Sequence, residues 1–167
     1  PADVHARPTG LSGDLPKYQQ RLPDEKRPQQ RDYNATRRAP DDGVGTFMQS
    51  VRKNGQLKNT LVIFMNDNGG PIYTGVQSNG PLRLGKLFLF EGGVRVPLII
   101  SWPGVVKPKQ VFREVTSSMD LFPTACSAAG IDLPSAMKLD GVNLLPCLSE
   151  QSGRSPHEFL FWSNGPN

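Results

Sequence analysis

The pattern of apolar and polar positions predicts two buried strands. Residues 61–65 form a continuous apolar run, Leu-Val-Ile-Phe-Met, with turn-forming residues on both sides. Such a run is typical of a strand that is buried on both faces. Residues 97–102, Pro-Leu-Ile-Ile-Ser-Trp, have the same character and stop at Pro103-Gly104. We therefore expect both segments to lie inside one sheet.

Two helices are predicted beside these strands. The first begins at Asp41-Asp42, where acidic residues suit a helix start, and its apolar positions recur at a spacing near 3.6 until Gly55. The second begins at Asp120 and continues to Gly130. A helix followed by a buried strand is typical of a parallel α/β sheet, in which ligands bind beyond the carboxyl ends of the strands.

The first 40 residues differ from the rest of the chain. They are polar and rich in proline. Because proline fixes φ and removes a hydrogen-bond donor, we expect no long helix or central strand there, only one short helix around residues 31–38. The chain is therefore divided into a loosely ordered segment, residues 1–40, and a folded domain, residues 41–167.

Composition narrows the classes of function. The 167 residues carry a net charge of +4 without a concentrated basic stripe, so no nucleic-acid partner is expected. No apolar run is long enough to span a membrane, and no signal peptide is visible. Cys126 and Cys147 define neither a disulfide framework nor a metal-ligand pair, and their small or apolar neighbours favour core positions.

The polar residues that follow the first strand are the candidate functional site. Asp67 and Asn68 offer a carboxylate and an amide oxygen, which are ligands that hard cations such as Ca²⁺ or Mg²⁺ prefer. Taken alone, Asp-Asn-Gly is also a common tight turn. Lys86 follows at a short distance along the chain and could hold an oxyanion beside a cation, or it could be a surface lysine. Both interpretations stay open at this point.

Two further features favour structural interpretations. Glu91 and Arg95 lie four residues apart around two glycines, so we expect an ion pair that shapes the loop. His5 is a lone histidine near a chain end, where solvation is the more common situation.

Five segments, one of which reads Glu-Gly-Gly-Val-Arg-Val-Pro, resemble a known family. They are residues 60–70, 79–86, 91–104, 118–124 and 139–146. Together they make the chain similar to the sulfatase family of the alkaline-phosphatase-like superfamily from about residue 41 to residue 162. The resemblance implies an α/β sandwich with a central, mostly parallel sheet flanked by helices. Residues 41–167 would then be part of a sulfatase catalytic domain, truncated at both ends.

The resemblance also implies a function. Family members hydrolyse sulfate esters with one bound divalent cation, usually calcium, and are often exported to a periplasmic, extracellular or lysosomal compartment. By position, Asp67 and Asn68 match two metal ligands, and Lys86 matches the lysine that binds the substrate sulfate. His5 resembles a sulfate-contacting histidine, although one more residue separates it from the following proline. The implied partner is a small-molecule or carbohydrate sulfate ester.

The chain departs from the family pattern at several positions. The family nucleophile is a formylglycine made from Cys or Ser in a Cys/Ser-x-Pro-x-Arg motif, and neither Cys126 nor Cys147 fits this motif. An upstream acidic pair of metal ligands is also missing. Leu84 and Leu87 stand where the family favours glycine. Arg37, Arg38 and Pro40 stand where the family continues a helix with apolar residues, so we expect this helix to be shorter here.

These departures keep two alternatives open beside a sulfatase fragment. One is a phosphatase or phosphodiesterase of the same superfamily. The other is a degenerate, non-catalytic protein that keeps the fold and binds a ligand. For the sulfatase fragment itself, we expect little or no turnover, because the covalent step needs the nucleophile.

Overall fold

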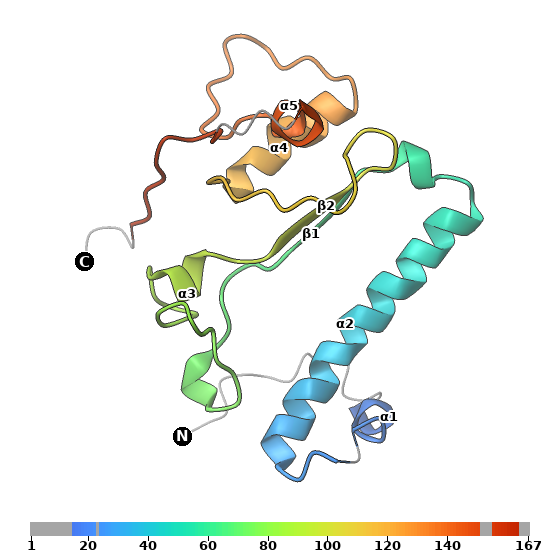
Figure 1. Ribbon diagram of the computed structural model, residues 1–167, viewed down its shortest axis with the longest axis vertical. Coiled ribbons are helices and arrows are strands. Elements are labelled where there is room, and N and C mark those ends of the chain that lie inside the picture. The colour runs from blue at the N-terminus through green and yellow to red at the C-terminus, as the bar shows by residue number, and fades with distance from the viewer. Residues whose placement is uncertain (1–14, 23, 151–154, 164–167) are drawn as a thin grey trace. The chain divides into compact units, whose positions relative to one another are not determined.

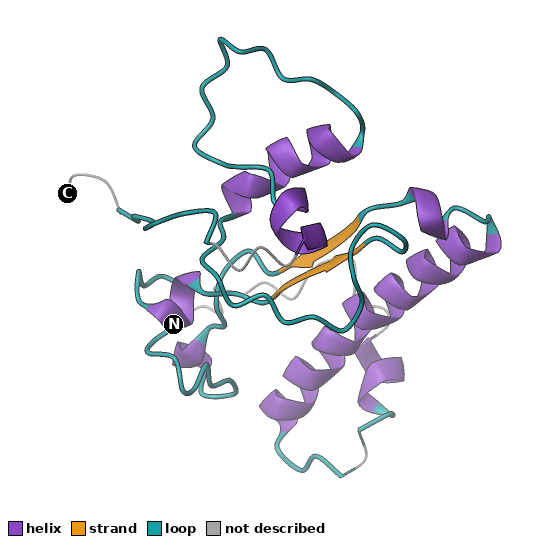
Figure 2. Cartoon of the chain, turned by 45° about the horizontal axis from the view of Figure 1, so that its top comes forward, coloured by secondary structure: helices purple, strands orange, loops and turns teal. Residues whose placement is uncertain are grey.

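The structure is a computed structural model that describes residues 15–22, 24–150 and 155–163. The chain forms two compact units, and each is described here by itself. The first unit comprises residues 1–55 and 71–78, and the second comprises residues 56–70 and 79–167. Helices, strands and loops are distinguished in Figure 2.

The first unit is built on two helices, α1 (Leu15–Gln19) and α2 (Pro28–Lys53), which lie side by side in Figure 1. Tyr18 of α1 packs with Ala35 and Ala39 of α2, and all three side chains are buried. The two alanines lie four residues apart on one face of α2. Their small side chains allow α1 to approach closely, and this contact forms the core of the unit.

Helix α2 corrects two sequence-based predictions. It is continuous from Pro28 to Lys53, so the expected helix start at Asp41 is wrong, and so is the expectation of no long helix before residue 40. Pro28 stands at the helix start, where a missing N–H has no consequence. Pro40 lies inside the helix and cannot donate to the Thr36 carbonyl, which costs about 3 kcal/mol.

A hydrogen bond explains the role of Asp42, which had been expected to cap the helix. The Arg21 guanidinium donates to Asp42 at 2.9 Å, between the segment after α1 and the middle of α2. This bond holds the pKa of the Asp42 carboxyl below its ordinary value. The predicted end of the helix is confirmed, since Asn54 is the C-cap and Gly55 has a φ of 70°.

The second unit contains both predicted strands, β1 (Val62–Met65) and β2 (Leu98–Ser101). They pair antiparallel, with Phe64 opposite Ile99 (Figure 1). The expectation of parallel pairing is therefore wrong for these two strands. Parallel neighbours need a crossover connection, usually a long helix, whereas the segment between β1 and β2 contains only short turns of helix.

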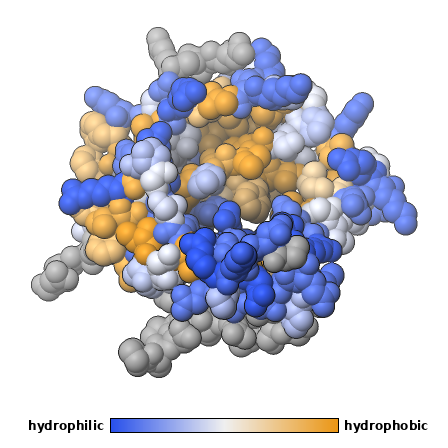
Figure 3. Space-filling view, turned by 60° about the horizontal axis from the view of Figure 1, so that its bottom comes forward, coloured by the Kyte–Doolittle hydropathy of each residue, from blue (hydrophilic) through white to orange (hydrophobic). Residues whose placement is uncertain are grey.

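One face of this strand pair is open to solvent. Phe64 is 44% exposed and its partner Ile99 is 59% exposed. The prediction of strands buried on both faces is therefore wrong for these residues. Apolar side chains also reach the surface elsewhere in the chain, as the space-filling view shows (Figure 3).

Short helical elements make up most of the remaining regular structure. These are η1 (Leu57–Asn59), η2 (Ile72–Thr74), α3 (Glu91–Val94), η3 (Ser118–Asp120), α4 (Leu121–Ala128) and α5 (Leu145–Glu150). The second predicted helix corresponds to η3 and α4. No helix in the described part of the chain is both long and apolar enough to cross a bilayer.

Candidate active site

The two predicted metal ligands follow β1 directly. Asp67 is exposed, and its Oδ1 accepts a hydrogen bond from the Asn68 backbone N–H at 2.9 Å. The Asn68 side-chain Nδ2 donates to the Gly69 carbonyl at 2.8 Å. This bond fixes the orientation of the amide group and leaves Asn68 Oδ1 as the atom that could bind a cation. Both side chains thus present oxygen atoms at the end of the strand.

Lys86 is joined to the same loop through its backbone. Its N–H donates to the Gly70 carbonyl at 3.1 Å, two residues after Asn68. The lysine is half-buried, whereas its neighbour Leu87 is exposed. The structure therefore brings the main chain of the predicted anion-binding residue against the loop that carries the predicted cation ligands.

Three segments meet here, residues 67–70, 79–86 and 91–93, and we call them the loop cluster. Main-chain hydrogen bonds hold them together. The Gly69 N–H donates to the Gly93 carbonyl at 2.8 Å, and the Gly92 N–H donates to the Arg83 carbonyl at 2.8 Å. The bond from Lys86 to Gly70 completes the connection between the segments. These main-chain bonds fix how the three segments lie against one another.

Glycine is required where these segments touch. A Cβ on Gly69 would lie 1.6 Å from the Gly92 carbonyl oxygen, and a Cβ on Gly92 would lie 2.0 Å from the Leu84 carbonyl oxygen. On Gly93, a Cβ would lie 2.0 Å from the Phe88 carbonyl oxygen. All three contacts are with backbone atoms, which cannot rotate away. A side chain at any of these positions would push the segments apart.

The predicted ion pair beside the glycines is confirmed. Arg95 Nη1 lies 3.3 Å from Glu91 Oε2, one helical turn away. Both side chains are exposed, so the pair contributes little to the free energy of unfolding. The pair joins the first residue of α3 to the residue that follows this helix. The connection of α3 to the other two segments is made by the backbone hydrogen bonds of Gly92 and Gly93.

Two leucines beside the lysine adopt left-handed backbone conformations. The φ angle is 59° at Leu84 and 79° at Leu87, a region that favours glycine. The unfavourable contact of Cβ with the following carbonyl costs roughly 1–2 kcal/mol per residue. The loop therefore keeps a backbone shape suited to glycine although the side chains are large.

Leu87→Gly is expected to stabilise the second unit by about 1 kcal/mol, since glycine removes the strain but adds chain entropy to the unfolded state. Leu87 is 75% exposed, so little apolar burial is lost. The free energy of unfolding in urea measures the effect. Leu89→Gly is the matched control because Leu89, also exposed, has no positive φ. Equal destabilisation by the two variants would contradict the assignment of strain to Leu87.

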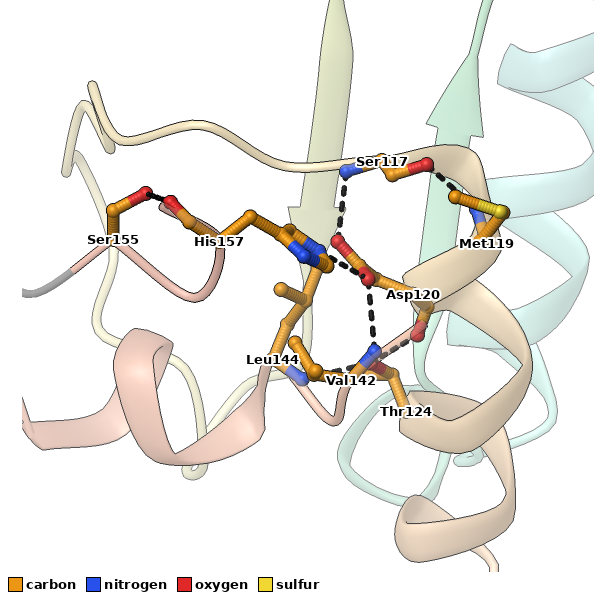
Figure 4. A network of polar contacts seen from close by, with 8 residues as sticks. All are labelled: Ser117, Met119, Asp120, Thr124, Val142, Leu144, Ser155 and His157. Atoms are coloured by element: carbon orange, nitrogen blue, oxygen red, sulfur yellow. Dashed lines mark hydrogen bonds and ion pairs between the residues drawn. The ribbon is translucent and has the colours of Figure 1, made fainter. Parts of the chain in front are cut away.

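A buried polar network lies outside the loop cluster, around Asp120 (Figure 4). The Asp120 carboxylate is fully buried and accepts hydrogen bonds from the Ser117 N–H at 2.7 Å and the Val142 N–H at 2.9 Å. His157 Nε2 lies 2.7 Å from Asp120 Oδ1. Asp120 is the N-cap residue of α4, where the helix is predicted to begin, but its side chain makes no capping hydrogen bond to α4. The carboxylate instead joins η3, the segment before α5, and the segment that contains His157.

Thr124 extends the network into α4. Its hydroxyl donates to the Asp120 carbonyl at 2.6 Å and accepts from the Leu144 N–H at 2.9 Å. Both Thr124 and Leu144 are buried. Every buried polar group named here thus has a partner, which is the condition for such a network to stabilise a fold. The network has a structural role, because its carboxylate is closed off from solvent.

A comparison with protein families identifies the chain. The family described as Sulfatase matches residues 3–131. The chain belongs to the sulfatase family. The resemblance that the sequence motifs indicated is therefore confirmed.

Named relatives of this sulfatase chain come from bacteria and mammals. It is 37% identical over 130 residues to the uncharacterized sulfatase YdeN of Escherichia coli (strain K12), covering 78% of this chain and 23% of that protein. It is 42% identical over 130 residues to the steryl-sulfatase of Rattus norvegicus, with 72% and 22% coverage. The N-acetylgalactosamine-6-sulfatase of the same organism is 41% identical over 119 residues, with 70% and 23% coverage. The chain thus spans about a quarter of these relatives' length.

Solved structures support the same assignment and confirm the α/β fold class. Ps i-CgsB in complex with k-i-k-neocarrahexaose matches with a TM-score of 0.73 and 36% identity, over 79% of this chain and 29% of that chain. The PsFucS1 sulfatase from Pseudoalteromonas sp. matches with a TM-score of 0.64 and 34% identity, over 75% and 25% of the two chains.

The sulfatase chain provides an incomplete set of cation ligands. Asp67 and Asn68 fit a hard cation by the chemistry of their oxygen atoms, but Ca²⁺ takes about 6–8 oxygen ligands. Among the described residues, no group of three or more His, Cys, Asp or Glu side chains could hold a metal ion. His5, the predicted sulfate contact, lies outside the described residues. The roles of these residues therefore stay predictions.

Proposed function

We propose that this chain supplies part of the active site of a sulfuric ester hydrolase, an enzyme that cleaves sulfate esters with water. The single observation that carries the proposal is the loop cluster, where the segment after β1 bonds to the backbone of Lys86. The membership in the sulfatase family supports the reaction class. An exported site of action, which the family resemblance implies, belongs to the same proposal.

Each residue has a separate role in this proposal. Asp67 and Asn68 bind a divalent cation, most suitably Ca²⁺, through their side-chain oxygens. The cation supplies positive charge that stabilises the sulfate group and the charge that develops on it. Lys86 binds a sulfate oxygen with its ammonium group, because a charge-assisted hydrogen bond to an oxyanion is about twice as strong as a neutral one. His5 is proposed as a further sulfate contact.

The nucleophile of the proposed reaction is a formylglycine, and its motif does not occur within these 167 residues. Cys126 and Cys147 are free thiols in the structure, and neither stands in a Cys-x-Pro-x-Arg sequence. We therefore expect the chain alone to bind sulfate weakly and to show no robust turnover. The proposed substrates are small-molecule or carbohydrate sulfate esters, the kinds of molecule for which the related steryl- and N-acetylgalactosamine-6-sulfatases are named.

Titrations with calcium and with inorganic sulfate test this division of roles. Asp67→Ala should abolish the weak calcium binding, because half of the available ligands is lost. Lys86→Ala should weaken sulfate binding about tenfold, corresponding to one charge-assisted contact. Isothermal titration calorimetry or amide chemical shifts can follow both ligands.

Lys107→Ala is the control for Lys86, since Lys107 is an exposed lysine of the same unit outside the loop cluster. An equal effect of the two lysine variants on sulfate affinity would exclude a specific role for Lys86. Unchanged calcium affinity in Asp67→Ala would remove Asp67 from the site. Robust hydrolysis of an aryl sulfate by this chain would contradict the requirement for a nucleophile from outside it.

A further inference from the structure

The Asn79 side chain connects two segments of the loop cluster, residues 67–70 and residues 79–86. Its Oδ1 accepts a hydrogen bond from the Gly70 N–H at 3.1 Å, and its Nδ2 donates to the Gly70 carbonyl at 3.0 Å. The same Nδ2 donates to the Leu84 carbonyl at 3.0 Å. One partly buried amide group thus contacts the main chain after Asn68 and the main chain before Lys86.

This bonding pattern depends on the chemistry of an amide. Asn79 pairs with both the N–H and the carbonyl of Gly70, as a neighbouring strand would. Only a side chain with an acceptor and a two-proton donor can make all three bonds. An aspartate of nearly equal size has no N–H to donate to the carbonyls of Gly70 and Leu84. Asparagine at this position can therefore make two hydrogen bonds that an aspartate of the same shape cannot make.

The Gly70 carbonyl is where Asn79 and Lys86 meet. It accepts from Asn79 Nδ2 and also from the Lys86 N–H at 3.1 Å. Asn79 in addition holds the carbonyl of Leu84, whose φ of 59° is unfavourable for leucine. Without this bond, Leu84 could relax to an ordinary conformation, and Lys86, two residues later, would move with it.

We propose that Asn79 is a positioning residue that sets the place of Lys86 relative to the cation ligands Asp67 and Asn68. This inference rests on the proposed function, because it requires that Lys86 binds sulfate and that Asp67 and Asn68 bind the cation. Asn79 itself binds neither the cation nor the sulfate. It acts through the backbone of Gly70 and Leu84, and its loss should impair anion binding more than cation binding.

Hydrogen exchange tests the structural half of the inference without any ligand. In Asn79→Ala and Asn79→Asp, the Lys86 amide should exchange at least about tenfold faster, because its bond to Gly70 opens more often. The amides of β1 and β2 that form hydrogen bonds between the two strands should keep their protection, which shows that the variants fold. Asn143→Ala is the matched control, since Asn143 also makes two side-chain hydrogen bonds in this unit, to Ser127 and Leu145.

Inorganic sulfate tests the functional half on the same proteins. Sulfate affinity should fall about tenfold in both Asn79 variants, as in Lys86→Ala, and stay unchanged in Asn143→Ala. Calcium affinity should change by less than sulfate affinity.

The outcomes separate the two proposals. Unchanged exchange of the Lys86 amide in both Asn79 variants overturns the inference whatever the sulfate result. Faster exchange with unchanged sulfate affinity overturns it too, provided that Lys86→Ala weakens sulfate binding. If the unchanged chain does not bind sulfate, or if Lys86→Ala does not weaken sulfate binding, the proposed function fails. The inference then fails with it, even if hydrogen exchange shows that Asn79 holds the loop.

Discussion

Gly69→Ala is expected to destabilise the second unit by about 3 kcal/mol or more. The added Cβ would lie 1.6 Å from the Gly92 carbonyl oxygen and 3.1 Å from Gly93 Cα. Neither neighbour is a flexible side chain, so the backbone itself must move. That movement breaks the bond from the Gly69 N–H to the Gly93 carbonyl.

Urea unfolding and hydrogen exchange measure this effect together. The free energy of unfolding should fall, and the amides of Gly69 and Gly92 should lose protection first. Gly45→Ala is the control, because a Cβ on Gly45 meets no atom within 4 Å and the residue lies inside helix α2. That substitution should stabilise by about 0.5–1 kcal/mol. Tolerance of alanine at Gly69 would mean that the three segments do not touch as described.

Asp120→Ala is expected to cost about 3 kcal/mol or more, because it leaves several polar groups without a partner and each unsatisfied buried group costs about 1–3 kcal/mol. The carboxylate is fully buried and contacts Ser117 N–H, Val142 N–H and His157 Nε2. Truncation leaves these buried polar groups without their acceptor, and it removes the connection between η3 and the two later segments.

Tryptophan fluorescence during urea unfolding can report this loss, since Trp102 and Trp162 both belong to the second unit. Asp140→Ala serves as the control, because Asp140 is an exposed aspartate of the same unit and should change stability by less than about 0.5 kcal/mol. A similar small change in both variants would show that the Asp120 network contributes no net stability.

The sequence allowed the strands and the candidate site to be located because their signals are local. Continuous apolar runs predicted β1 and β2 within one or two residues of their observed bounds. The position of Asp67, Asn68 and Lys86 after the first apolar run marks them as candidates, and the family resemblance assigns each of them a role. The end of α2 was also predicted, since Asn54-Gly55 is a strong helix stop.

The errors came from features that depend on tertiary contacts. Pro40 was expected to limit a helix, but the packing of Ala35 and Ala39 against Tyr18 stabilises α2 on the N-terminal side of this proline. Buried contacts outweigh local propensity in such cases.

The Asp120 network was missed for a similar reason. The spacing of Ser117 and Asp120 is that of a capping box, which the structure contains, and it could have indicated part of the network. Nothing local in the sequence indicated that His157 would lie against Asp120, because the two residues are 37 positions apart. The role of Asn79 has no local signal either, because its side-chain bonds to Gly70 and Leu84 form only when the chain is folded.

The close approach of Gly69, Gly92 and Gly93 to neighbouring carbonyls has a consequence for how this region tolerates variation. Its shape is encoded by three positions where side chains are absent, and the chemical identity of most other residues there matters less. In a library of variants screened for folding, exposed positions such as Arg83 and Phe88 should accept many amino acids. The three glycines should accept no other amino acid. They are therefore the positions of this region that a folding screen should find most restricted, although glycine has no side chain to make contacts.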